Sequence, residues 1–196
     1  SLFNTANNLG NNNITAIFSD SKGLLWIGTD DGLSRYDGYS FVVYRHNNTD
    51  TTSIAGNMIR AIDETPDGNL WIATVEHGLC VWKRNNNTFT CINNRKNNKG
   101  TLPELEIQGI KVIDGDVYVK TRNYISIIHS QSLQVESFPI IENLIKKFDH
   151  GKAFLLSIDN SKQLIIGGAD GCHLFDITNK RFIKTPPQLN YYGAIN

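Results

Sequence analysis

The sequence repeats itself at a nearly constant interval, and this repeat restricts the possible fold more than any other feature. A turn, an apolar run and a Trp follow one another at 21–29 and again at 66–74. The first segment reads Ser-Lys-Gly-Leu-Leu-Trp-Ile-Gly-Thr and the second reads Pro-Asp-Gly-Asn-Leu-Trp-Ile-Ala-Thr. Two weaker copies follow, around Tyr118 and around Ile165. Self-similarity with a fixed period of about 20–50 residues is typical of solenoids and propellers.

Each copy of the repeat consists of short runs that are rich in β-branched and aromatic residues. Turn residues such as Asp-Gly separate these runs, which have the length and composition of strands. The anchor positions are Trp26, Trp71, Tyr118 and Ile165, and they are 45, 47 and 47 residues apart. The first two copies predict strands near 14–18, 24–28, 32–36, 40–45, 58–63, 69–74, 78–83 and 88–92. No segment has a sustained helical period, although 141–147 could form one short turn.

Four short antiparallel strands in every stretch of about 40–50 residues are typical of propeller blades. We therefore predict an all-β chain, a β-propeller with about four four-stranded antiparallel blades. The expected blades are 13–45, 57–92, 107–138 and 152–185, and a further blade begins at 191–196. The anchor side chain is interpreted as a wedge between neighbouring blades, where an aromatic ring buries a large area.

Composition excludes several classes of function. With 40% apolar and 19% charged residues, the chain fits a soluble globular protein and not a disordered one. Nineteen basic residues balance nineteen acidic ones, so no global charge would hold a nucleic acid. No stretch reaches the roughly 18 apolar residues of a membrane span, and no signal peptide is visible. The absence of a starting Met suggests a processed or excised chain.

Three cysteines do not form a disulfide framework. Cys80 and Cys91 flank a predicted hairpin whose register also pairs Val81 with Thr90. This register sets the two thiols opposite each other, with a Cα separation of about 4.5–5.5 Å that a disulfide can bridge. Two small apolar residues in a packed sheet are the simpler interpretation, and it is the one we favour. Cys172 stays outside the pair in either case.

The segment Ile14–Phe41 closely resembles the two-component regulator propeller repeat, and Ala61–Trp82 resembles it nearly as well. In the third copy, Arg122-Asn123-Tyr124 replaces the acidic-Gly turn and no Trp is present. The fourth copy keeps Gly167, Asp170 and Gly171 but lacks the aromatic anchor. The resemblance is thus specific for two blades and supportive for the others. Rings of this family usually have more than four blades, so the resemblance implies that these blades form part of a larger ring of seven or eight blades.

The resemblance implies a role that the spacing itself does not show. Proteins with such repeats are typically periplasmic sensor regions of hybrid two-component histidine kinases in Bacteroides-like bacteria. They are associated with the detection of glycans, so a glycan-derived ligand is the expected partner. Other domains of the same parent chain are expected neighbours, and a homodimer is a further hypothesis. Any kinase activity would lie outside these residues.

No catalytic, metal or cofactor motif is present in the sequence. The five histidines lack ligand spacing, and no nucleophile elbow, phosphate loop or dinucleotide fingerprint occurs. Propellers usually recognise ligands with the loops between the second and third strands and with the connections between blades. The connections 45–57, 93–106 and 139–152 are long and polar, although Asn-rich loops are also ordinary turn formers. The positions that we select for ligand binding are Asp31, Arg60, Glu76, His77, Arg122, Asn123 and Asp170.

Three functional interpretations remain open at this stage. The favoured one is a sensor module that binds a glycan, or a protein carrying one, and carries no enzyme activity of its own. The second is a scaffold that contacts other domains or a twin subunit. The third is a lyase, since some lyases are built on similar propellers, and His77 beside Glu76 is its only support.

Overall fold

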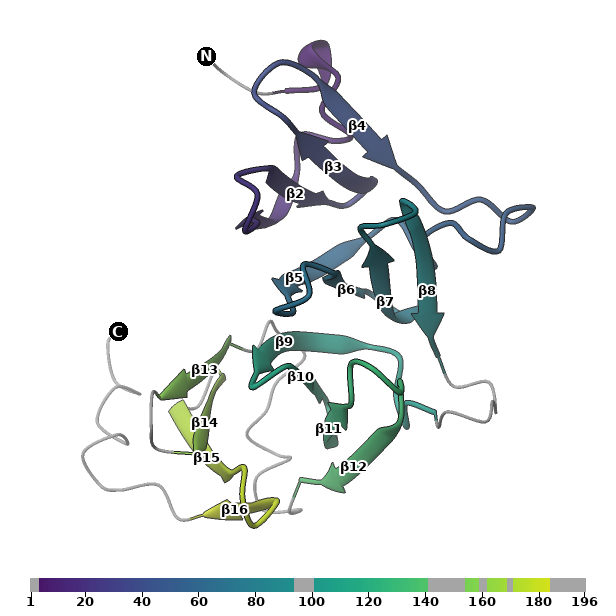
Figure 1. Cartoon of the computed structure of the whole chain (residues 1–196). Helices are drawn as coiled ribbons and strands as arrows, with labels where there is room; N and C mark the ends of the chain where they lie inside the picture. Colours follow the sequence, from purple (N-terminus) through teal and green to yellow (C-terminus); the bar gives the residue numbers. More distant parts are fainter. Residues whose placement is uncertain (1–3, 94–100, 141–153, 159–161, 169–170, 184–196) are drawn as a thin grey trace.

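The chain forms four antiparallel sheets, each made of four strands that are consecutive in sequence (Figure 1). This computed structural model describes residues 4–93, 101–140, 154–158, 162–168 and 171–183. The first blade contains β1 (Ile14–Ser19), β2 (Leu25–Thr29), β3 (Gly32–Tyr36) and β4 (Phe41–Tyr44). The second contains β5 (Ile59–Glu64), β6 (Leu70–Thr74), β7 (Gly78–Lys83) and β8 (Thr88–Ile92).

The third and fourth sheets repeat the same strand order. The third blade contains β9 (Ile107–Ile113), β10 (Asp116–Thr121), β11 (Tyr124–Ile128) and β12 (Val135–Pro139). The fourth contains β13 (Phe154–Ile158), β14 (Gln163–Gly168), β15 (Gly171–Asp176) and β16 (Arg181–Ile183). The all-β propeller prediction is confirmed, and the strands expected in the first two blades agree to within one residue. In the described part of the chain the one helical element is a 3-10 turn, η1 (Thr5–Asn7).

The blades are arranged radially. The first strands β1, β5, β9 and β13 contact one another in succession, whereas the fourth strands are not in comparable contact. Figure 1 shows the sheets fanning outward from the side where β5, β9 and β13 lie. The first strands therefore form the inner rim of the stack, and no described strand pairs with their free edges. The expected turn at 141–147 and the expected further blade at 191–196 lie outside the described residues.

The anchor position occupies the same place in all four sheets. Trp26, Trp71, Tyr118 and Ile165 each stand three residues before the end of the second strand. Trp26 is fully buried against Leu70 and Trp82 of the second blade, and its indole centroid lies 4.8 Å from that of Trp82. Trp71 fills the next interface with apolar residues of the third blade. Trp26, Trp71 and Tyr118 thus each pack against the blade that follows.

Ile165 departs from the expected wedge because it is only half-buried. Its neighbours in β14, Leu164 and Ile166, point the other way and pack against Tyr118 of the third blade. By the same alternation, Ile165 faces away from the third blade, toward a side where no described segment packs. The opposite end of the stack shows the same effect. Ile17 of β1 is 66% exposed, whereas its equivalent Ile62 packs against the Trp26 cluster.

Close approach between blades also explains one glycine. A Cβ on Gly28 of β2 would stand 2.6 Å from a methyl carbon of Ile59 in β5, well inside contact distance. The position therefore has to remain small for the inner ends of the first two blades to touch. The second blade has Ala73 there, and the third has Lys120, whose longer side chain turns toward the loops.

Cys80 and Cys91 form a disulfide between β7 and β8, with a Cα separation of 4.0 Å. The predicted register is confirmed, because Cys80 pairs with Cys91 and Val81 with Thr90. Our preference for two reduced, packed cysteines is wrong. Directly opposed positions on neighbouring antiparallel strands bring the two sulfurs within bonding reach without any movement of the backbone.

Candidate functional site

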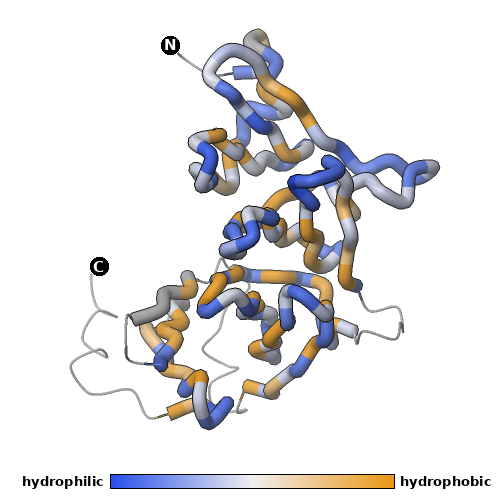
Figure 2. Tube along the Cα trace, in the orientation of Figure 1, coloured by the Kyte–Doolittle hydropathy of each residue, from blue (hydrophilic) through white to orange (hydrophobic). Residues whose placement is uncertain are grey.

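The loops between second and third strands meet the connections between blades at one end of the sheets. Gly32 at the start of β3 donates its N–H to Asn57 O (2.7 Å), and Gly78 at the start of β7 donates to Leu105 O (3.3 Å). Each connection therefore passes directly over the loop of the blade that it leaves. Figure 2 shows that the connection between β4 and β5 is polar over most of its length, unlike the strands on either side. We call this end the loop face.

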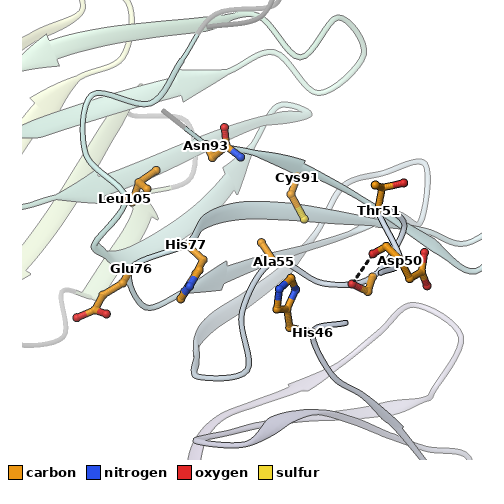
Figure 3. A pocket seen from close by; sticks show the side chains of 10 residues that line it. His46, Asp50, Thr51, Ala55, Glu76, His77, Cys91, Asn93 and Leu105 are labelled. Carbon is orange, nitrogen blue, oxygen red and sulfur yellow. Dashed lines mark hydrogen bonds between the residues drawn. The ribbon is translucent and has the colours of Figure 1, made fainter. Parts of the chain in front are cut away.

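A groove of about 440 Å³ opens on the loop face of the second blade (Figure 3). One wall is the connection between the first two blades, and the other is the β6–β7 loop with the ends of the disulfide-linked hairpin. The lining is mostly polar and includes imidazole, carboxylate, hydroxyl and amide groups. Its residues are His46, Asp50, Thr51, Ser53, Ala55, Glu76, His77, Cys91, Asn93 and Leu105.

The connection that forms the first wall is held in place by its own hydrogen bonds. The His46 Nδ1–H donates to Ile54 O (2.8 Å), and the Ser53 hydroxyl donates to Asp50 O (2.8 Å). Thr52 donates both its hydroxyl and its backbone N–H to the Asp50 carboxylate, which lowers the pKa of Asp50 below its ordinary value. Phe89 N donates to Thr52 O (2.8 Å) and ties the connection to β8. The wall is thus ordered before any ligand binds.

His77 forms the second wall, and two local features place its ring. Glu76 adopts a left-handed conformation (φ 69°), which turns the chain sharply after β6. Gly56 lies beside the imidazole, where a Cβ would stand 2.8 Å from Nδ1. The Nδ1–H donates to Val75 O (3.0 Å), so in the neutral ring Nε2 carries the lone pair and is an acceptor. The Glu76 side chain points away from His46 and the Asp50–Thr51 turn (Figure 3).

The structure brings together two of the selected residues, Glu76 and His77, and gives two others contacts between loops. Asp31 pairs with Arg45 Nε (3.2 Å) and accepts from Asn57 Nδ2 (3.4 Å). Asn123 binds the Glu104 carboxylate with its backbone N–H (3.0 Å) and its side-chain amide. Asp31 joins its loop to the connection that leaves the first blade, and Asn123 joins its loop to the connection that enters the third blade. Neither contact requires a ligand.

The remaining selected residues are scattered. Arg122 is exposed, and its backbone carbonyl accepts from Lys120 Nζ (3.3 Å). Arg60 lies on the inner strand β5 and not on a loop. Asp170 lies outside the described residues. All seven assignments remain predictions.

Several groove residues were missed individually, namely His46, Asp50, Thr51, Ser53 and Asn93. The available signal was the length and polarity of the connections that contain them. No group of three or more potential metal ligands occurs among the described residues. Within the same ranges, no helix has both the length and the apolar character that crossing a bilayer requires.

Comparison with known proteins identifies the repeat. Residues 8–31 and 53–76 match the family described as two component regulator propeller. The chain therefore carries two-component regulator propeller repeats. The two matched segments are 45 residues apart, and each ends in the loop after β2 or β6. They lie in the first two blades, where the Trp anchors occur.

A curated relative and two solved structures place these repeats in context. Histidine kinase P4 of Formosa agariphila is 42% identical over 53 residues, which are 27% of this chain and 4% of that protein. The extracellular domain assigned to a hybrid two-component system of B. thetaiotaomicron aligns with a TM-score of 0.77 at 19% identity. That alignment covers 97% of this chain and 27% of the other. Virginiamycin B lyase from Staphylococcus aureus aligns with a TM-score of 0.67 at 15% identity, over 93% of this chain and 59% of the lyase.

These comparisons differ in what they establish. At 19% and 15% identity, the two solved structures establish the propeller fold alone. The chain spans only a small part of the kinase and of the extracellular domain that it matches. The comparisons therefore do not assign the functions of those whole proteins to this chain.

Proposed function

We propose that this chain is a ligand-sensing propeller module on the extracytoplasmic side of a two-component signalling protein, with a carbohydrate as its ligand. The observation that carries the proposal is the ordered polar groove on the loop face of the second blade. The second matched regulator segment begins in the first wall, at residue 53, and ends at the second wall, at residue 76. A ligand in the groove would contact the connection between the first two blades on one side and the β6–β7 loop on the other.

The chemistry of the lining suits sugar hydroxyls. Each hydroxyl both donates and accepts hydrogen bonds, so it pairs with carboxylate, imidazole, amide and hydroxyl groups alike. Asp50 supplies an ionised acceptor, the ring of His77 supplies Nε2, and Asn93 supplies both a donor and an acceptor. A volume of about 440 Å³ lies within the range of about 300–1,000 Å³ that is common for small-molecule sites.

Two observations support an extracytoplasmic location. Disulfides persist in oxidising compartments such as the periplasm and are rare in the cytosol, and Cys80–Cys91 is a disulfide. The chain also aligns over 97% of its length with the extracellular domain assigned to a hybrid two-component system of B. thetaiotaomicron.

Calorimetric titration of the intact chain with a panel of plant and host oligosaccharides tests the proposal. We expect one member of the panel to bind and His77→Ala to weaken its binding about three- to tenfold, as the loss of one or two neutral hydrogen bonds predicts. His129→Ala is the matched control, because this imidazole follows β11 at the opposite end of the third blade. No binding by any member of the panel would contradict the proposal.

A scaffold function is the second candidate, and the exposed apolar side chains of the first blade favour it. Ile14 and Ile17 of β1 are 42% and 66% exposed, although the equivalent residues of β5 are covered by the first blade. A second copy of the chain or another domain would bury them. Sedimentation velocity distinguishes this candidate, because a dimer that Ile17→Ser dissociates supports it and a monomer at all concentrations contradicts it.

A further inference from the structure

The inner strands of three blades contain a β-bulge at the same position. In β1, β5 and β9 the pairing with the second strand skips one residue near the loop face. The skipped residues are Thr15, Arg60 and Gln108. All three are polar, although the strands around them are largely apolar. A bulge releases one residue from the ladder and redirects its side chain, so the repeat places polar groups at its inner rim.

Arg60 is the unusual member of this set. Its neighbours in β5 pack to opposite sides, Ile59 with the Trp26 cluster and Ala61 with the Trp71 cluster. The Arg60 Nε is buried and has no hydrogen-bond partner among the described residues. In the described part of the chain, no carboxylate forms an ion pair with its guanidinium. A buried donor on a charged group is costly when it is left unpaired, so its retention in a folded protein requires an explanation.

A second cation lies behind the neighbouring bulge. Lys120 of β10 is fully buried, and its Nζ donates to Gln108 Oε1 (2.8 Å). Burial lowers the pKa of Lys120 to about 8, so the amine is still mostly protonated at neutral pH. The carboxylate that acts on it belongs to Glu104, whose oxygens accept from Asn123. The inner rim of the second and third blades therefore holds two cations, and Arg60 has no acidic partner among the described residues.

We propose that the inner rim at the loop face binds the anionic group of an acidic ligand, a carboxylate or sulfate, with Arg60 as its principal contact. A guanidinium presents a planar fork of donors that matches the oxygens of either anion. A neutral hydroxyl would satisfy Nε but would leave the charge uncompensated. That the anion belongs to an acidic sugar rests on the function proposed above, whereas the anion site itself does not.

The Nε–H signal of Arg60 in a ¹⁵N-labelled sample of the intact chain provides a direct test. Sodium sulfate and sodium glucuronate are titrated separately at constant ionic strength. Sodium chloride is the control for the added salt, and glucose is the neutral control for glucuronate. We expect a saturable shift of the Arg60 signal with sulfate or glucuronate and none with glucose. The signal of Arg181, on the outer strand β16, should follow only the bulk salt. An Arg60 signal that behaves like the Arg181 signal would overturn the proposal.

Substitutions make the test quantitative. Arg60→Gln should weaken binding of the anion at least about tenfold, because hydrogen bonds to charged groups are the stronger ones. Arg181→Gln should leave it unchanged. If Arg60→Gln binds the anion as tightly as the unmodified protein, Arg60 is not the contact. If Arg60→Gln does not fold, the unmodified protein still decides the question through its Nε–H signal.

The two proposals fail in different ways. Sulfate binding at Arg60 without binding by any oligosaccharide would keep the anion site and remove the sugar sensor. Oligosaccharide binding that leaves the Arg60 signal unmoved would keep the sensor and remove the anion site. A further titration compares the affinities for glucuronate and sulfate. The anion that binds more tightly identifies the class of acidic group.

Discussion

The interface between the first two blades differs from that between the third and fourth, although both use the same positions of the repeat. In the first, Trp26 packs on Trp82 and donates its indole N–H to Asp20 (2.9 Å). Arg84 of the second blade then binds the same Asp20 carboxylate (2.8 Å) and closes the interface. In the later interface, Tyr118 and Phe175 occupy the apolar centre, and a buried Lys120 lies at its inner end.

The comparison shows that the anchor keeps its position in the sheet even where its residue type changes. Tyr118 has no counterpart of Asp20, yet its place in the sheet and its burial against the next blade are those of Trp26. Hydrophobic burial is not directional, so a propeller tolerates different apolar side chains at the anchor as long as the alternation of faces is kept. The regulator repeat is recognised only where the Trp and its polar partners are both present.

The largest expected effect comes from removal of a buried anchor. Trp26→Ala should lower the free energy of unfolding by about 3–5 kcal/mol, because it removes a fully buried indole and leaves a cavity. Ile165→Ala at the half-buried end position should cost only about 1 kcal/mol. Urea unfolding of both variants measures the difference. Equal costs would show that Ile165 is covered like the interior anchors.

The disulfide gives the second effect, and it belongs to the second blade alone. Replacement of both Cys80 and Cys91 by Ala should lower stability by about 2–4 kcal/mol, because the bridge restricts the unfolded chain. Cys172→Ala, outside the bridge, is the matched control and should change stability by less than about 1 kcal/mol. Reduction of the unmodified protein should move its urea midpoint to that of the double variant. A midpoint that does not respond to reduction argues against the bridge.

The third effect depends on pH and belongs to the interface of the third and fourth blades. Burial lowers the pKa of Lys120 to about 8, below its value in the unfolded chain. Between pH 8 and 10 the unfolded chain binds a proton that the folded chain does not, so stability rises with pH there. We expect a gain of about 2 kcal/mol over this range. Tyr118 stays neutral, because burial raises its pKa to about 12.

Lys120→Met separates this effect from other titrations. The variant should lack the rise in stability between pH 8 and 10, whereas the unmodified protein should show it. The ¹³Cε shift of Lys120 gives the pKa in the folded protein directly. An ordinary lysine pKa in that measurement would contradict the burial of the amine.

The sequence predicted the first two blades in detail because turn residues, strand composition and the Trp anchors agree there. The exposure of Ile165 was not predictable from its place in the repeat, since it depends on what covers the next face. The pairing of Cys80 with Cys91 followed from strand register, but their oxidation did not, because register fixes distance and not redox state. The position of Lys120 within the repeat was likewise predictable from the spacing, but the burial of its side chain was not.

The candidate site was less predictable than the fold. Asp31 and Asn123 have the composition of ligand-binding loop residues, yet their partners Arg45 and Glu104 lie 14 and 19 residues away in crossing connections. Short polar side chains serve loops and ligands equally well, so sequence alone does not separate the two uses. The groove became visible only when the connection and His77 were placed side by side.

The central claim is that the three interior anchors, Trp26, Trp71 and Tyr118, are each buried against the blade that follows. The contact between Trp26 and Trp82 tests it most directly. Their ring centroids lie 4.8 Å apart, although the residues belong to different blades. Nuclear Overhauser effects between the protons of these two indoles should therefore be strong in the intact chain. A folded, β-rich protein without any such effect between Trp26 and Trp82 would contradict the account.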